Sequence, residues 1–163
     1  MSWKIEIHRA KPNPTGKDKA GGYPKPEQLL GEWVDLKNTG DGSVSLSTLY
    51  LANNEFDANC NVTKEAVIYW NGESGVTVNA GKIVRVHSGK SSDSAVMKSE
   101  DKEGVDLHAY AGKGNFILNN KCGDTLTVRW KTSDGKWLED DRASYDANPQ
   151  EGKVLKRSGS KLI

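Results

Sequence analysis

Long apolar runs, clustered cysteines and sustained helical periodicity are all missing from this sequence of 163 residues. Hydrophobic residues make up 35% of the chain, and no stretch reaches the roughly 18 apolar residues that a membrane-spanning helix requires. The first six residues lack the apolar segment and the small-residue cleavage site of a signal peptide. We therefore expect no membrane association and, by default, a cytoplasmic protein.

Cysteine is scarce, with only Cys60 and Cys122 in the chain. Structural zinc sites need clustered Cys and His ligands, and the spacing of these two residues matches no such motif. In an exported protein the pair would form one disulfide, whereas in a reducing cytosol it would stay as two free thiols. The sequence leaves both alternatives open.

The formal net charge of +1 conceals an uneven distribution. Residues 1–31 carry six Lys/Arg and three Asp/Glu, residues 152–163 carry four Lys/Arg and no acid, and the body between them has a net charge of −6. An acidic body argues against a basic nucleic-acid-binding face. We expect the two basic ends to be frayed, solubilising segments, and weak nucleic-acid binding through them is the alternative.

Short stretches with period-two alternation of apolar residues recur between turn-forming residues, and this pattern predicts many short strands. Strand signals cover residues 3–8, 32–38, 44–46, 48–51, 66–70, 75–78, 83–87, 105–110, 125–130, 137–138 and 143–145. About eight or nine strands make a single all-β domain over residues 1–163, a sandwich or a barrel. The residues expected between two sheets are Val34, Leu36, Val44, Leu46, Val84, Val86, Leu126 and Val128.

Two long polar segments interrupt this pattern. Residues 11–28 contain Pro12, Pro14, Pro24 and Pro26, and residues 88–104 consist mainly of Ser, Lys, Asp and Glu. Both offer few apolar groups to offset the entropy of ordering. We expect them to be exposed, mobile loops.

Taken in their order along the chain, several segments resemble the lamin tail domain, an immunoglobulin-like β-sandwich found in nuclear lamins and in many bacterial proteins. The matching segments are EWVDLKN at 32–38, VSLS at 44–47, AGKIVRV at 80–86, GDTLTV at 123–128, residues 130–135, and a closing pattern with Tyr145, Pro149, Glu151, Gly152, Leu155 and Arg157. The chain departs from the family where Thr48-Leu49 replaces Gly-Trp and where Ala80 replaces Pro. The similarity covers residues 31–157 and implies an immunoglobulin-like β-sandwich. It also implies a module without an active site that binds proteins and, in some members, DNA.

The sequence shows no recognisable catalytic motif. A Gly-x-Ser-x-Gly elbow and a His-Glu-x-x-His zinc motif are both missing. Residues 57–61 copy the first ligand positions of an EF-hand loop, but Val62 replaces the required Gly and Ile68 the required Glu. We expect no metal, no cofactor and no catalytic residue, and a hydrolase with an unrecognised site is a second alternative.

Two tryptophans and two histidines are the candidate partner contacts. Trp33 and Trp70 lie in predicted strands and could line a binding face, because Trp is a frequent interface anchor; packing in the core is the alternative. His87 and His108 end two predicted strands and could be neighbours. We therefore expect a non-enzymatic binding or scaffolding module with a protein partner. Nucleic-acid binding should be weak or absent, and the sequence gives neither the partner's identity nor the oligomeric state.

Overall fold

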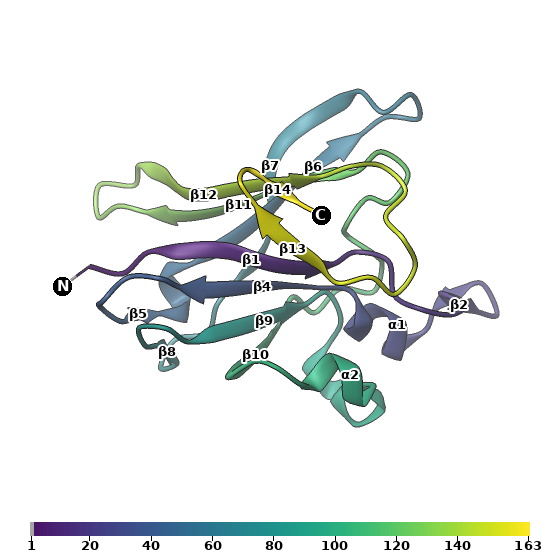
Figure 1. Ribbon diagram of the computed structural model, residues 1–163, viewed down its shortest axis with the longest axis horizontal. Helices are drawn as coiled ribbons and strands as arrows, with labels where there is room; N and C mark the ends of the chain where they lie inside the picture. The colour runs from purple at the N-terminus through teal and green to yellow at the C-terminus, as the bar shows by residue number, and fades with distance from the viewer. Residues whose placement is uncertain (1) are drawn as a thin grey trace.

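A computed structural model describes residues 2–163 and consists mainly of β-strands, which confirms the predicted all-β class. Ten strands form one large sheet in the order β10-β9-β4-β1-β13-β14-β12-β11-β6-β7. The sheet folds over itself, so that β10, β9, β4 and β1 form one layer and β12, β11, β6 and β7 the other (Figure 1). The result is a sandwich that is nearly closed into a barrel.

The elements have the following bounds. The first layer comprises β1 (Ile5–Lys11), β4 (Trp33–Asn38), β9 (Ile83–His87) and β10 (Leu107–Tyr110). The second comprises β6 (Tyr50–Phe56), β7 (Val62–Asn71), β11 (Asp124–Lys131) and β12 (Trp137–Tyr145), and β13 (Leu155–Ser158) and β14 (Lys161–Leu162) connect the layers. Two small sheets pair β2 (Lys19–Ala20) with β3 (Tyr23–Pro24) and β5 (Val44–Ser45) with β8 (Thr77–Val78). The helical segments are α1 (Pro26–Gly31), η1 (Leu46–Thr48), η2 (Ser91–Val96) and α2 (Ser99–Lys102).

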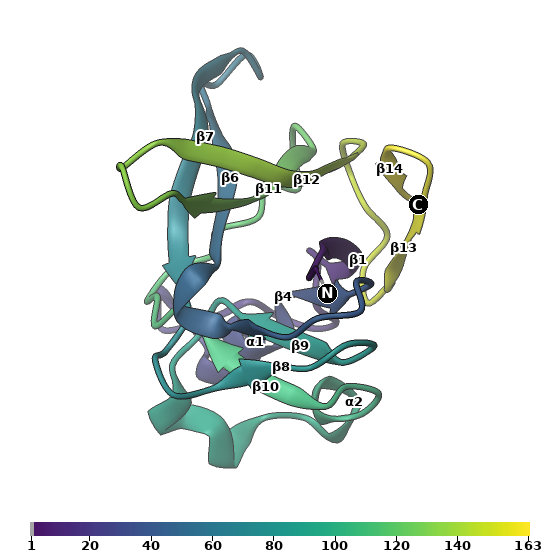
Figure 2. The same ribbon diagram turned by 90° about the vertical axis from the view of Figure 1, so that its left-hand side faces the viewer.

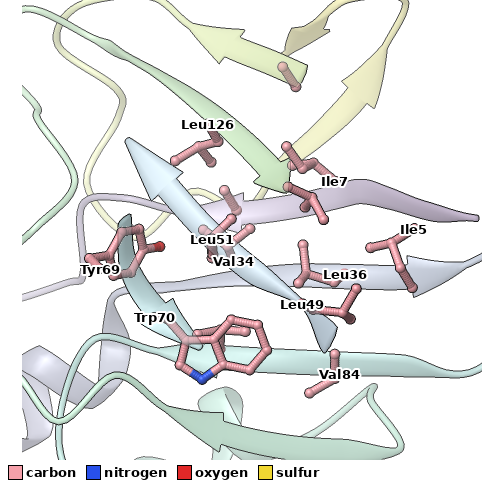
Figure 3. Packing of buried hydrophobic residues seen from close by; sticks show 14 of the residues in the cluster. Ile5, Ile7, Val34, Leu36, Leu49, Leu51, Tyr69, Trp70, Val84 and Leu126 are labelled. Carbon is pink, nitrogen blue, oxygen red and sulfur yellow. The ribbon is translucent and has the colours of Figure 1, made fainter. Parts of the chain in front are cut away.

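The hydrophobic core lies between the two layers, as the alternation predicts. Val34 pairs with Val86 and Leu36 with Val84 in the β4–β9 ladder, so that all four side chains share the inner face. All eight residues predicted to be buried are at most 5% exposed. Figure 3 shows four of them in the packed cluster, Val34, Leu36, Val84 and Leu126, together with Ile5, Ile7, Leu49, Leu51, Tyr69 and Trp70. Burying each of them stabilises the fold by about 1.5–3 kcal/mol.

Side chains, rather than a backbone ladder, join the first half of β1 to β12. The carboxylate of Asp140 accepts a hydrogen bond from the Ile5 N–H at 2.6 Å, and Asp141 accepts one from the Ile7 N–H at 2.7 Å. Arg157 holds Asp141 through two hydrogen bonds of 2.6 and 3.0 Å. Beside these contacts, β13 and β14 complete the connection between the layers (Figure 2).

The basic ends are not frayed, in contrast to the expectation from charge. β1 lies inside the large sheet between β4 and β13, and β13 and β14 lie between β1 and β12. Ile5 and Ile7 are fully buried, and Leu155 and Leu162 are at most 5% exposed. These four apolar side chains, spaced among the basic residues, anchor both ends in the core.

Residues 11–28 are not simply an exposed loop, since they include β2, β3 and the start of α1, and Lys11 and Gln28 are buried. The polar stretch 88–104 is not one either. It carries η2 and α2, and its Asp101 is fully buried. Asp101 lies against the outer face of the first layer, where it meets a lysine and a tryptophan of that sheet. The segment is therefore held by polar contacts, which substitute for the apolar residues that it lacks. Within residues 2–163 no helix is both long and apolar enough to cross a membrane.

Candidate functional site

A groove of about 500 Å³ lies between the β6–β7 hairpin and the loop formed by residues 111–122. The hairpin projects beyond the rest of its layer (Figures 1 and 2). The groove is lined by Asn53, Asn54, Glu55, Phe56, Thr63, Val67, Ile68, Tyr69, Lys113, Phe116, Ile117 and Asn119. Half of these residues are apolar or aromatic, and the charged ones are a single lysine and a single glutamate.

The loop wall of the groove is fixed to the fold by Glu32, which is fully buried. Its Oε1 accepts hydrogen bonds from the Ser88 hydroxyl at 2.6 Å and from the backbone N–H groups of Ile117 and Leu118 at 2.8 and 3.2 Å. Its Oε2 has no hydrogen-bond partner among the described residues. Because burial outweighs these donors, the pKa of Glu32 is raised to about 7.

A second buried carboxylate, Asp124 at the start of β11, connects the same loop to the hairpin. It accepts hydrogen bonds from the side chain of Asn53 at 3.0 Å and from the backbone N–H groups of Asn54 at 3.0 Å and Asn119 at 3.1 Å. Burial raises the pKa of Asp124, against the opposing effect of these donors. Both walls of the groove are thus positioned by buried acids beneath it.

A disulfide between Cys60 and Cys122 joins the two walls covalently. Cys60 lies in the turn of the β6–β7 hairpin and Cys122 at the end of the loop, so the structure selects one of the two alternatives that the sequence left open. Gly123 follows with a φ of +74°, and a Cβ at this position would lie 2.4 Å from the carbonyl oxygen of Tyr145. Only glycine fits this turn into β11.

The residues that copy part of an EF-hand form the turn of the hairpin. The Asp57 carboxylate accepts hydrogen bonds from the backbone N–H groups of Asn59 and Asn61, both at 2.9 Å. These hydrogen bonds lower the pKa of Asp57. The acid therefore stabilises a turn, and within residues 2–163 no group of three or more His, Cys, Asp or Glu could hold a metal ion.

A network of charged side chains fills the space between the first layer and α2. The Arg85 guanidinium lies 3.5 Å from the centre of the Trp33 ring and donates to Asp35 at 2.7 and 2.9 Å. Asp101 accepts a hydrogen bond from the Trp33 Nε1 at 2.9 Å and pairs with Lys11. Because all five side chains are at most 4% exposed, each charge depends on its partner.

His87 and His108 form a hydrogen-bonded pair beside this network. His87 Nδ1 lies 2.6 Å from the Leu30 carbonyl oxygen, His87 Nε2 lies 2.8 Å from His108 Nδ1, and His108 Nε2 lies 3.1 Å from the Lys102 carbonyl oxygen. A carbonyl only accepts. Each of the three contacts therefore needs its own proton to be a hydrogen bond. Two neutral imidazole rings carry only two ring protons, so a third would give the pair one positive charge.

The surroundings of the pair oppose that charge. Burial lowers the pKa of His87 to about 4, and it also lowers the pKa of His108, with a further contribution from Arg85. Burial dominates, because His87 is completely enclosed. At neutral pH the pair then holds two protons, and one of the three contacts is not a hydrogen bond.

A second cavity, of about 180 Å³, lies at the seam between the two terminal strands of the large sheet, β7 and β10. It is lined by Leu46, Trp70, Asn71, Glu73, Val76, Ser91, His108, Ala109 and Tyr110. Tyr110 also stacks on His87, with ring centres 5.2 Å apart. This cavity is referred to below as the seam cavity.

The four residues that the sequence singles out as partner contacts lie in two places. Trp70 and His108 line the seam cavity, and His87 lies behind His108. Trp33 belongs to the charged network under α2. Trp33, Trp70 and His87 are 2, 4 and 0% exposed, so core packing, the alternative for the tryptophans, describes Trp70 well. Partner contact by these residues stays a prediction.

Sequence reasoning missed the groove and the acids beneath it. Phe116 and Ile117 lie in a stretch without strand periodicity, and Glu32 and Asp124 stand in the sequence only as polar members of strand motifs. The one available signal was the presence of two cysteines, because a disulfide between residues 60 and 122 brings the hairpin to the loop.

Comparison with known proteins adds no family to this description. No protein-family model matches the chain, and no curated protein matches its sequence. The similarity to the lamin tail domain therefore rests on the sequence motifs alone. The structure itself establishes a sheet-rich chain whose large sheet is nearly closed into a barrel.

Proposed function

We propose that this protein is a non-enzymatic binding module that takes up an extended segment of another polypeptide along β7. The observation that carries the proposal is that β7, a terminal strand of ten residues, runs beside the groove. In this arrangement a partner strand would pair with the open side of β7 and place alternate side chains in the groove.

The edge of β7 is suited to such pairing. Within the large sheet β7 pairs only with β6, so its other side presents backbone donors and acceptors without a neighbouring strand. Val62 and Ile68 are 46 and 36% exposed along it. Lys64, Glu65 and a kink at Ala66, where φ is +49°, interrupt the edge, and these features limit indiscriminate strand pairing.

The groove favours a partner with apolar side chains. Phe56, Val67, Phe116 and Ile117 are all half-buried there, and the lining carries no net charge. Affinity should therefore come from backbone hydrogen bonds and apolar burial, with little dependence on salt. Nucleic-acid binding through neutralised phosphates would instead fall steeply with salt.

Two further assignments are part of the proposal. The Cys60–Cys122 disulfide supports residence in an oxidising compartment, in place of the cytoplasm expected by default. The order of the motifs between residues 31 and 157, together with the all-β fold, supports a divergent immunoglobulin-like domain of the lamin tail kind.

The experiment is selection of random linear peptides of 12 residues on the immobilised protein. Selected peptides should bind at least tenfold more weakly to the variant Val67→Glu, which places a charge in the groove. Binding to Leu138→Glu should be unchanged, because Leu138 is an exposed apolar residue on β12 that does not line the groove. Failure to enrich any peptide, or equal binding to both variants, would contradict the proposal.

Backbone methylation of a selected peptide tests the mode of binding. In a strand only alternate N–H groups point to a given neighbouring strand. N-methylation at every second position should abolish binding, and methylation at the intervening positions should be tolerated. Equal effects at all positions would contradict strand addition.

A further inference from the structure

The seam cavity has chemistry of its own, separate from the groove. Three rings form part of its wall, those of Trp70, His108 and Tyr110. Glu73 is its one carboxylate, and neither lysine nor arginine lines it. His108 contributes no charge at neutral pH, because burial and Arg85 lower its pKa.

Such a lining attracts a cation. The faces of Trp and Tyr rings carry partial negative charge and bind ammonium groups, most strongly where water is excluded. Trp70 lines the cavity and is only 4% exposed, so this part of the wall is largely shielded from water. Glu73 is exposed at the edge of the cavity, where a carboxylate can neutralise a bound cation without itself being desolvated.

The volume limits the size of the ligand. A cavity of roughly 150 Å³ accommodates benzene in another protein, and the seam cavity measures about 180 Å³. We propose that the seam cavity binds a small alkylammonium group of up to about seven non-hydrogen atoms, with Trp70 and Tyr110 against its alkyl surface and Glu73 as its counter-ion.

Choline and 3,3-dimethyl-1-butanol provide the test, because they have the same shape and differ in charge. Each is titrated into ¹⁵N-labelled protein at pH 7.5, and the indole N–H of Trp70 and the amide of Ala109 are followed by NMR. Choline should shift both signals and bind at least tenfold more tightly than the neutral alcohol. Since no peptide is used, the result does not depend on the proposed function.

Two variants locate the site. Glu73→Gln should reduce the preference for choline without abolishing it, because the rings still attract the cation, whereas Glu100→Gln, at an exposed glutamate on α2, should leave the preference unchanged. Ala109→Leu should fill the cavity and abolish binding of both probes. Equal affinities for the two probes in the wild-type protein, or shifts that persist in Ala109→Leu, would overturn the proposal, as would no shift at millimolar choline.

Discussion

Replacing Glu32 by glutamine should make the protein more stable at alkaline pH and remove one component of its pH dependence. The carboxyl is fully buried, and burial raises its pKa from an ordinary value of 4.5 to about 7. Between these two values the unfolded chain is ionised while the folded chain keeps the proton. The folded state then binds more protons than the unfolded state, so stability falls as pH rises.

The magnitude follows from the shift. Each pKa unit corresponds to about 1.4 kcal/mol, so Glu32 alone should lower the free energy of unfolding by about 3 kcal/mol between pH 4.5 and pH 8. Glutamine keeps the oxygen that accepts from Ser88, Ile117 and Leu118 but never ionises. The difference in stability between Glu32→Gln and the wild type should therefore increase by about 3 kcal/mol over this range.

Urea unfolding of both proteins without reductant, followed by near-ultraviolet circular dichroism from pH 4.5 to 8, provides the measurement. His87, whose pKa of about 4 lies below its ordinary value, makes stability fall as pH drops below 6.5. Its effect is present in both proteins and cancels in the difference. A difference that stays constant to within about 0.5 kcal/mol across the range would refute the desolvation argument.

Three other predictions concern the disulfide, the buried network and nucleic acid. Replacing Cys60 and Cys122 together by serine should lower the free energy of unfolding by about 4 kcal/mol, since the crosslink spans 62 residues, and thermal unfolding with and without reductant measures it. Asp101→Asn should lower the free energy of unfolding, measured with urea, by about 3–5 kcal/mol, because it leaves Lys11 buried without a counter-charge and weakens the hydrogen bond from Trp33. A decrease below about 1 kcal/mol would show that the network is dispensable for stability. Duplex DNA at physiological salt should not change in fluorescence anisotropy on titration with the protein, because the −6 charge of the body repels phosphate, and affinity that survives this salt would contradict the charge argument.

The strands could be predicted because their signal is local. Val84 and Val86, or Leu126 and Val128, alternate with polar neighbours within a few residues, and this pattern is sufficient to assign the inner face of a sheet. The pattern does not predict the last two strands, β13 and β14, since each has one deeply buried apolar residue among basic and small ones.

The groove and the polar network could not be predicted in this way. Asp101 meets Lys11 across 90 positions and Trp33 across 68, and Glu32 meets Ile117 across 85. No short window of sequence contains both members of such a pair. A lone acid in a polar stretch looks the same whether it becomes solvated or fully buried, and only the folded arrangement of the strands decides between the two.

The disulfide also makes residues 60–122 a covalent ring. The ring contains β9 and β10 of one layer and all of β7 of the other, while their partners β4 and β6 lie on the chain outside it. A protease that cuts once within the ring, for example in the surface segment that carries η2, would leave a single covalent molecule with every strand still attached. Separation into two fragments would then need a reductant as well as a cut.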